Sequence, residues 1–280
     1  MISAGERAYI TQCVEGGLRG DGRGCLDHRV TRLDVGTIPQ ANGSARVQLG
    51  GTDVMVGVKV EIGAPLAFRP DSGRVEFNVD FSPCGSPDFE GKEGEVLGAD
   101  LANALARSVV VGPDGKAGGL DLATLSILPG NSCWVIFVDA LILNNDGSLL
   151  DAVTMAMRGA LAEIRIPHVE ITKGDSAEVP EFEIDNEKSS KLDAGAVPII
   201  VTVAKIGRRY LVDLTSEEEL CSDFSLHIAV NAEGRVCGVT KKGSTPVHAS
   251  VMQEMLELAQ RIGPKVIESL DAYIVDVLGE

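Results

Sequence analysis

The chain is poor in basic residues relative to acidic ones. Of its 280 residues, 25 are Lys or Arg and 41 are Asp or Glu, which gives a formal net charge of −16. A protein that binds a nucleic-acid backbone by itself usually carries clustered Lys and Arg. We therefore expect weak autonomous binding to nucleic acid, although a partner could still contribute a basic surface.

Several other features are absent. The six cysteines form no Cys-x-x-Cys pair, and the four histidines are too scattered for zinc spacing. This pattern predicts reduced thiols, no disulfide framework, no bound metal and no cofactor. The sequence contains no P-loop and no nucleophile-elbow motif. No apolar run approaches the roughly 20 residues of a membrane span, and the N-terminal segment MISAGERAYITQ lacks a signal-peptide pattern. These absences favour a protein of the cytosol or nucleus.

The patterns that are present indicate strands and helices in a repeated order. Residues 44–62 alternate apolar and polar positions around GGTD, which predicts a hairpin. Further strands are expected over 74–82, 120–128 and 133–143, the last apolar on both faces and therefore covered on both. Helical spacing of apolar residues predicts helices over 96–108 and from about residue 147.

The second half repeats this order. Strands are expected over 197–206 and 210–214, with a hairpin around Asn231–Gly234 and a long closing helix. Pro264 lies inside that helix, so we expect a kink or two helices there. The polar, acidic segment 173–195 predicts an exposed crossover loop. The expected organisation is a first subdomain over 1–172, the loop 173–195 and a second subdomain over 196–280, in an α+β fold of mixed sheets with packed helices.

The segment LILNNDGSLL ends a strand and starts a helix at once. A helix N-terminus can hold an anion, but Asp146 and Ser148 are also typical N-cap residues, with Gly147 in the turn. Asp139, inside the preceding apolar strand, is expected to be a buried polar group with satisfied hydrogen bonds.

Six short motifs together carry a resemblance to a known family. They are RGDGRG (19–24), DHR (27–29), GSARV (43–47), GTDV (51–54), DFEG (88–91) and CWV (133–135). The chain resembles the RNase PH family from about residue 15 to the final helix, and it is most similar to the ring subunits of the eukaryotic RNA exosome. The resemblance implies a duplicated β-α unit of the ribosomal-protein-S5-like kind. It also implies six-subunit rings around an RNA channel, in which attached nucleases do most of the cutting.

The resemblance also implies that catalysis is lost. Active members carry Asp-Gly-Gly-Thr-Arg at the strand-to-helix turn, where the loop and the Arg hold the attacking phosphate. Here Leu149 replaces the Thr and Leu150 replaces the Arg, and leucine offers no charge-assisted donor to a phosphate dianion. We therefore expect no catalytic residues and no enzyme activity.

A second motif of active members places two aspartates six residues apart. Glu219 and Ser225 fall on these positions, and a shifted register offers Asp223 instead. Glu217–Glu219 is read either as a solvated helical turn, which we favour, or as a relic Mg²⁺ site. An active phosphorolytic 3′–5′ exoribonuclease with a shifted metal site remains the alternative function.

Candidate RNA contacts are Lys92, Arg23 and Arg29. Active members carry paired arginines before the helix that here begins with Lys92, which stands beside two glutamates. Arg19, Arg23, Arg29 and Arg32 form the densest basic patch. They face RNA or tie the N-terminal segment to carboxylates, and we favour the second reading.

The expected function is that of a non-catalytic ring subunit of the RNA exosome, which helps to form the channel that guides single-stranded RNA to nucleases. The partners implied by the resemblance are other RNase PH-like ring subunits, S1/KH cap subunits, an associated exonuclease and single-stranded RNA, with no membrane. The implied locations are nucleus, nucleolus and cytoplasm.

Overall fold

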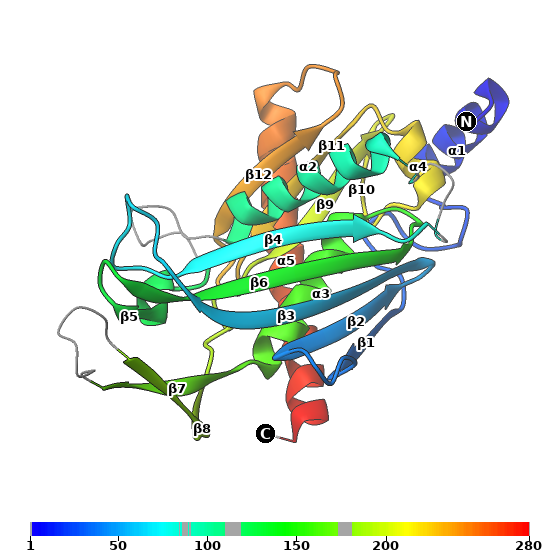
Figure 1. Ribbon diagram of the computed structural model, residues 1–280. Helices are drawn as coiled ribbons and strands as arrows, with labels where there is room; N and C mark the ends of the chain where they lie inside the picture. Colours follow the sequence, from blue (N-terminus) through cyan, green and yellow to red (C-terminus); the bar gives the residue numbers. More distant parts are fainter. Residues whose placement is uncertain are drawn as a thin grey trace.

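A buried helix lies between two β-sheets in the computed structural model of the protein (Figure 1). The structure describes residues 2–83, 85, 89, 91–109, 119–172 and 181–279. Within these residues the larger sheet has the order β1-β2-β3-β6-β4 with β5 paired to β6, the second has the order β10-β9-β11-β12, and β7 pairs with β8. The strands of the larger sheet are β1 (Thr31–Val35), β2 (Gly43–Leu49), β3 (Thr52–Gly63), β4 (Arg74–Phe81), β5 (Ser126–Leu128) and β6 (Ser132–Asn144).

The predicted hairpin over 44–62 is confirmed as β2 and β3. Alternate side chains of β3 enter the core because Val54, Val56 and Val58 point to one face and are buried. The turn is shorter than expected: Gly50 adopts a positive φ of 60°, and β3 begins directly after Gly51. β6 pairs antiparallel with β3 and parallel with β4, which places it inside the sheet.

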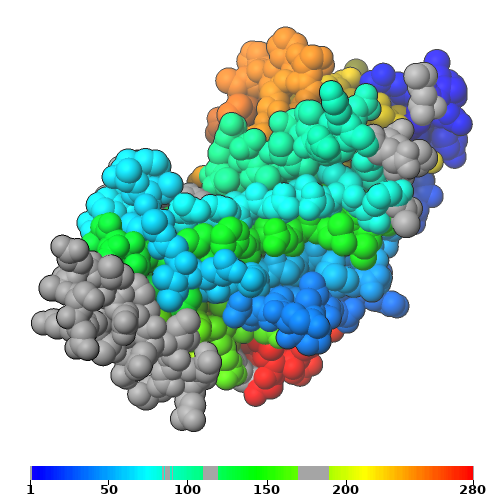
Figure 2. All heavy atoms as spheres, viewed as in Figure 1, coloured from blue at the N-terminus to red at the C-terminus, as the bar shows by residue number. Residues whose placement is uncertain are grey.

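The prediction that β6 is covered on both faces holds only for its first half. From Ser132 to Ile136 every residue is buried, whereas Asp139 and Leu141 are exposed on the outer face of the sheet. Figure 2 shows this face, where atoms of β3 and β6 reach the molecular surface. Asp139 is therefore not a buried polar group, because it points away from the core-facing side of its strand.

Helix α3 (Leu149–Glu163) is the centre of the fold. It contacts β2 and β3 on one side and β9 on the other, and all residues from 150 to 161 are buried. Helix α2 (Lys92–Val109) packs on β4 and reaches β12, while α5 (Ala249–Leu278) packs on β9, β11 and α3. The apolar stripes of α2 and α3 are largely buried, whereas the stripe of α5 is buried only in its middle part and leaves Met252, Tyr273 and Val277 exposed.

The second sheet contains β9 (Ile199–Ile206), β10 (Arg209–Val212), β11 (Phe224–Val230) and β12 (Val236–Lys242). Its β9 side chains are almost all buried because α3 and α5 contact this strand and α1 also packs against it. Val14 of α1 (Ala4–Glu15), Leu214 and Cys221 at the end of α4 (Ser216–Cys221) form a smaller apolar cluster with Ile206 of β9.

The closing helix is continuous, so the expectation of two helices is wrong. Pro264 lies inside α5 without ending it. Buried side chains anchor the helix on both sides of the proline, with Met255 and Ala259 before it and Ile267 and Leu270 after it. This packing outweighs the loss of one backbone hydrogen bond at the proline.

Two other predictions need correction. Residues 120–128 do not form one strand, because the 3-10 helix η2 (Leu122–Leu125) precedes β5 and is capped by Asp121, whose carboxylate accepts from the Ala123 N–H at 3.0 Å. The predicted crossover loop is also partly wrong. β8 (Glu181–Lys191) pairs antiparallel with β7 (Arg165–Thr172), which satisfies the backbone of this polar stretch, and residues 173–180 lie outside the described residues. Across the described residues, no helix is long and apolar enough to span a membrane.

Candidate functional site

Three segments that are distant in sequence meet at the N-terminus of α3. They are the loop Asn145–Ser148 after β6, the N-terminal segment 19–29, and residues 213–219 from the end of β10 into α4. The two motifs singled out in the sequence, at 146–150 and at 211–225, are therefore brought together in space. The chemistry of this site depends on which of its charged side chains are not already bound in ion pairs.

Asp213 is the acceptor at the centre of this cluster. It is 0% exposed and adopts a left-handed backbone with φ of 49°. Its carboxylate accepts from the backbone N–H of Arg29 at 2.6 Å and from the Arg29 guanidinium at 2.7 and 3.0 Å. Arg23 Nη1 donates to it at 3.0 Å. Sequence reasoning gave Asp213 no role, although an aspartate following the apolar strand YLV was a visible signal.

Arg29 joins Asp213 to the loop before α3. Its Nη1 donates to the Asp146 carbonyl at 2.7 Å and to the Asp146 carboxylate at 3.2 Å, and Nη2 donates to the carbonyls of Gly147 and Leu214 at 3.3 Å. Burial by itself would lower the pKa of Arg29, but the hydrogen bonds and charge of Asp213 raise it overall. The guanidinium is therefore a permanent cation whose donors are already used inside the chain.

A second buried ion pair lies beside the first. The guanidinium of Arg19 forms a two-bond pair with the Glu218 carboxylate, with Nε to Oε1 at 2.8 Å, and it also donates to the carbonyls of Val212 and Asp213 at 2.9 and 2.7 Å. Glu218 also closes a capping box with Thr215 at the start of α4. The reading of Glu217–Glu219 as a solvated turn is therefore wrong for Glu218, because Arg19 holds its carboxylate in the interior.

The N-terminus of α3 is occupied by the chain's own carboxylate. The backbone N–H of Ser148 donates to Glu219 Oε1 at 2.8 Å, and Lys242 Nζ lies 3.3 Å from Glu219 Oε2. Ser148 occupies the N-cap position of α3, as expected, but its side chain makes no capping hydrogen bond and donates to the Leu214 carbonyl at 3.2 Å. The Asp146 carboxylate does not cap the helix, because it accepts from Arg29 and Ser216. Ser148 adopts a left-handed backbone with a φ of 52°, whereas an N-cap residue usually has an extended backbone.

The side chains that replace the family's phosphate donors are apolar here. Leu150 is buried, and Leu149 is half-buried and packs against the core. The residues of the alternative metal site lie in different environments. Asp223 is exposed and lies 4.0 Å from Arg7 of α1, while Ser225 is buried in β11. In the part of the chain that the structure describes, no group of three or more His, Cys, Asp or Glu is arranged to hold a metal ion.

The predicted RNA contacts lie in different environments. Lys92 is exposed at the first position of α2, whose first turn also carries Glu93 and Glu95. Arg23 and Arg29 are tied to carboxylates, as the structural reading of the basic patch expects. Contact of these three residues with RNA stays a prediction.

A buried polar chain beneath the site was missed by sequence reasoning. Asp151 of α3 accepts from the Thr202 N–H at 2.9 Å and from its hydroxyl at 2.5 Å, and this hydroxyl lies 2.8 Å from His227 Nδ1. Burial raises the pKa of Asp151 from 3.8 to about 8, and burial lowers the pKa of His227 from 6.5 to about 4. Both groups are thus mostly uncharged at neutral pH. A lone aspartate in an apolar helix was the available signal.

Comparison with known families agrees with this architecture. Residues 27–167 match the model of the 3′ exoribonuclease family (RNase PH), domain 1, and residues 196–262 match domain 2 of the same family. The chain therefore belongs to the RNase PH family of 3′ exoribonucleases.

Its relatives include exosome components. The chain is 32% identical to a Dictyostelium discoideum protein provisionally named exosome complex exonuclease RRP42, over 99% of this chain and 98% of that protein. It is 32% identical to the exosome complex component Rrp42 of Methanosarcina acetivorans, over 92% and 91%. A chain of the Archaeoglobus fulgidus exosome with RNA bound to the active site has a TM-score of 0.77 and 29% identity, over 94% of this chain and 97% of that chain.

Proposed function

We propose that this protein is a non-catalytic ring subunit of the RNA exosome. The relatives named as exosome components support the assembly. The observation that carries the loss of catalysis is the Glu219 carboxylate, which accepts the hydrogen bond of Ser148 N–H where a phosphate-binding member would present that N–H to phosphate.

The charges around that position disfavour a phosphate dianion. Arg29 and Arg23 are committed to Asp213, and Lys242 pairs with Glu219. An arriving phosphate would meet the carboxylates of Asp146 and Glu219. The remaining attraction of a helix N-terminus is about 0.3–1 kcal/mol near a surface, which is smaller than the repulsion from two nearby carboxylates.

The function left to such a chain is geometric. β1 and β4 end the larger sheet and β12 ends the second, so their strand edges could pair with neighbours of the same fold. The other edge strand, β10, is partly covered, because the Val212 backbone already bonds to Cys25 and Arg19. In the proposed ring, the chain forms part of a channel that admits single-stranded RNA and guides it to an associated exonuclease. Other RNase PH-like subunits flank it, and S1/KH subunits cap the ring. Its net charge of −16 implies that neighbours and caps supply most of the positive potential along the channel. The proposed locations are nucleus, nucleolus and cytoplasm.

Release of nucleoside diphosphates tests the loss of catalysis. The full chain is incubated with single-stranded RNA, Mg²⁺ and phosphate, beside a phosphorolytic member of the family as positive control. We expect no release above the buffer blank. Phosphate-dependent release that Asp223→Ala abolishes and the exposed-site control Asp139→Ala leaves unchanged would establish the alternative, an active exoribonuclease with a shifted metal site.

A further inference from the structure

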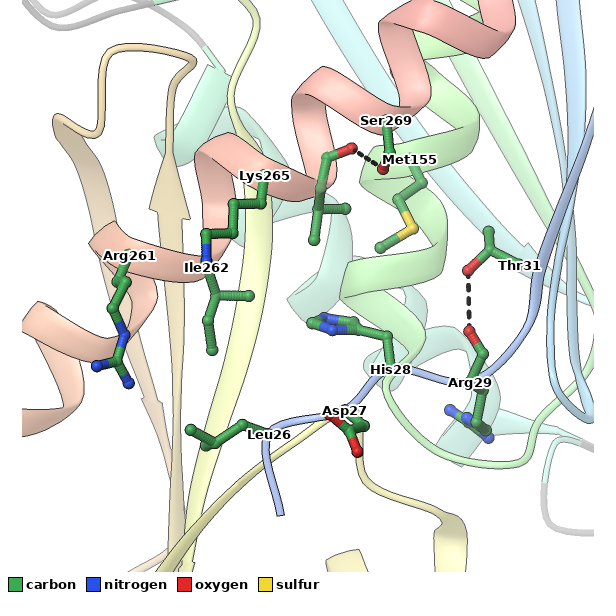
Figure 3. A pocket seen from close by; sticks show the side chains of 11 residues that line it. Leu26, Asp27, His28, Arg29, Thr31, Met155, Arg261, Ile262, Lys265 and Ser269 are labelled. Atoms are coloured by element: carbon green, nitrogen blue, oxygen red, sulfur yellow. Dashed lines mark hydrogen bonds between the residues drawn. The ribbon is translucent and has the colours of Figure 1, made fainter. Parts of the chain in front are cut away.

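A cavity of about 760 Å³ opens between the N-terminal segment, α3 and α5 (Figure 3). One wall is α5, which contributes Arg261, Ile262, Lys265, Val266 and Ser269. The opposite wall is the segment from Leu26 to Thr31, and Met155 of α3 closes the floor. The volume lies within the range of about 300–1,000 Å³ typical of small-molecule sites.

Two cations on the α5 wall form no ion pair with the residues described. Arg261 and Lys265 are both exposed and stand one helical turn apart, so their side chains are neighbours on the same face. Neither forms an ion pair with any of the residues described, in contrast to the buried arginines Arg19 and Arg29. In a chain of net charge −16, two unpaired cations at one cavity are a local reversal of the overall charge.

The acidic group at the cavity does not neutralise them. Asp27 lines the wall, but its carboxylate points away from α5 in Figure 3 and accepts from the Gly24 N–H at 3.0 Å. The guanidinium of Arg29 likewise points away from α5 in Figure 3 and is held by Asp213. The net charge presented inside the cavity is therefore positive and comes from Arg261 and Lys265.

Most of the remaining lining is apolar or aromatic, and the hydroxyls of Thr31 and Ser269 donate to the carbonyls of Arg29 and Val266. Leu26, Ile262, Val266 and Met155 supply apolar surface, and the His28 ring projects between the two walls (Figure 3). Burial lowers the pKa of His28, so the ring is mainly neutral at pH 7 and offers a flat face and one ring N–H. A fitting ligand thus combines an anionic head with a flat or apolar body.

We propose that this cavity binds a phosphate monoester carrying a planar group, with the phosphate between Arg261 and Lys265 and the planar group beside His28 and Ile262. A phosphate dianion matches two cations, and guanidinium groups bind phosphate oxygens in pairs. A single carboxylate would leave one cation unmatched. A free mononucleotide and the 5′-phosphate end of an RNA chain share this chemistry.

Calorimetric titration of the full chain tests the proposal, with adenosine monophosphate as probe and adenosine and inorganic phosphate as partial ligands. We expect the mononucleotide to bind more tightly than either part. The double variant Arg261→Gln/Lys265→Gln should weaken its binding about tenfold or more, because two charge-assisted contacts are lost. The control Arg107→Gln/Arg208→Gln changes the same net charge at exposed positions outside the cavity and should leave binding within about twofold.

Further measurements distinguish a free mononucleotide from the 5′-phosphate end of RNA, and both of these from a protein segment bound in the cavity. Binding of a 5′-phosphorylated tetra-adenylate without binding of the mononucleotide would assign the site to an RNA end. Circular dichroism and melting of each variant show that the fold is retained. Equal binding by the two double variants, or binding of an acidic peptide without any phosphate ligand, would overturn the proposal, the second result by assigning the cavity to a protein segment.

Discussion

Replacing Asp213 with Asn removes the charge on which the cluster at the head of α3 is built. The side chain is 0% exposed and accepts from the backbone and guanidinium of Arg29 and from Arg23. Asn keeps the shape and tolerates the left-handed backbone, so the change isolates the charge. Removing one partner of a buried ion pair costs about 3–5 kcal/mol, and Asn retains one acceptor oxygen, which points to about 3 kcal/mol.

The assay is equilibrium urea unfolding with a parallel thermal melt. A loss of about 3 kcal/mol corresponds to a melting temperature about 6–12 °C lower for a chain of this size. Asp139→Asn is the matched control, because Asp139 is exposed and makes no ion pair with any residue described, and it should change stability by no more than about 0.5 kcal/mol. Asp213→Gly relieves the left-handed backbone but loses the carboxylate, so it should also destabilise. Equal unfolding midpoints for Asp213→Asn and Asp139→Asn would refute the reasoning.

Three further predictions concern pH, the head of α3 and RNA. The folded pKa of Asp151 is raised from 3.8 to about 8, so its contribution to stability is complete below pH 4 and is lost as pH rises to 8, by at most about 1.4 kcal/mol per pH unit. The folded pKa of His227 is lowered from 6.5 to about 4, so its contribution to stability is instead lost as pH falls below 6.5. Denaturant unfolding of Asp151→Asn against wild type should show the variant gaining relative stability between pH 5 and 8, and a constant difference would contradict this. Glu219→Gln should lower the free energy of unfolding by about 0.5–1 kcal/mol in the same assay. It should not create phosphate-dependent activity, because Leu149 and Leu150 remain. The appearance of activity would show that the Glu219 carboxylate alone blocks the site. Fluorescence titration with labelled single-stranded RNA at physiological salt should give a Kd of about 10⁻⁶ M or weaker for the free chain, and markedly tighter binding would reveal a basic groove.

The hairpins and the main helices could be predicted from the sequence because their signals are local. The alternation of Val54, Val56 and Val58 fixes which face of β3 is buried, and Gly50 supplies the positive φ of the turn. The polar composition of β8 predicted an exposed loop, but antiparallel pairing with β7 satisfies its backbone hydrogen bonds and makes it a strand. Pro264 suggested two separate helices, but packing on both sides of the proline keeps α5 continuous.

The sequence indicated which side chains of the site differ from active relatives, but it did not indicate the contacts within the site. The leucines at 149 and 150 were readable as replacements because the resemblance supplied the pattern. The pairing of Arg29 with Asp213 joins residues 184 positions apart, and no local spacing encodes it. The occupation of the Ser148 N–H by Glu219 likewise depends on how α4 packs against the head of α3. Asp139 was expected to be buried but is exposed, since an aspartate in an apolar strand can equally face solvent.

Whether this chain is a ring subunit is decided most directly by its solution mass when it is co-expressed with an RNase PH-fold neighbour. Obligate interfaces bury roughly 2,000 Å² or more and are relatively apolar, so a ring subunit is stabilised when neighbours cover its strand edges. A ring subunit should appear in a ring-sized assembly containing this 29.4 kDa chain, with a higher melting temperature than the chain alone. A monodisperse monomer of 29.4 kDa, with a melting temperature that no candidate neighbour changes, would contradict it.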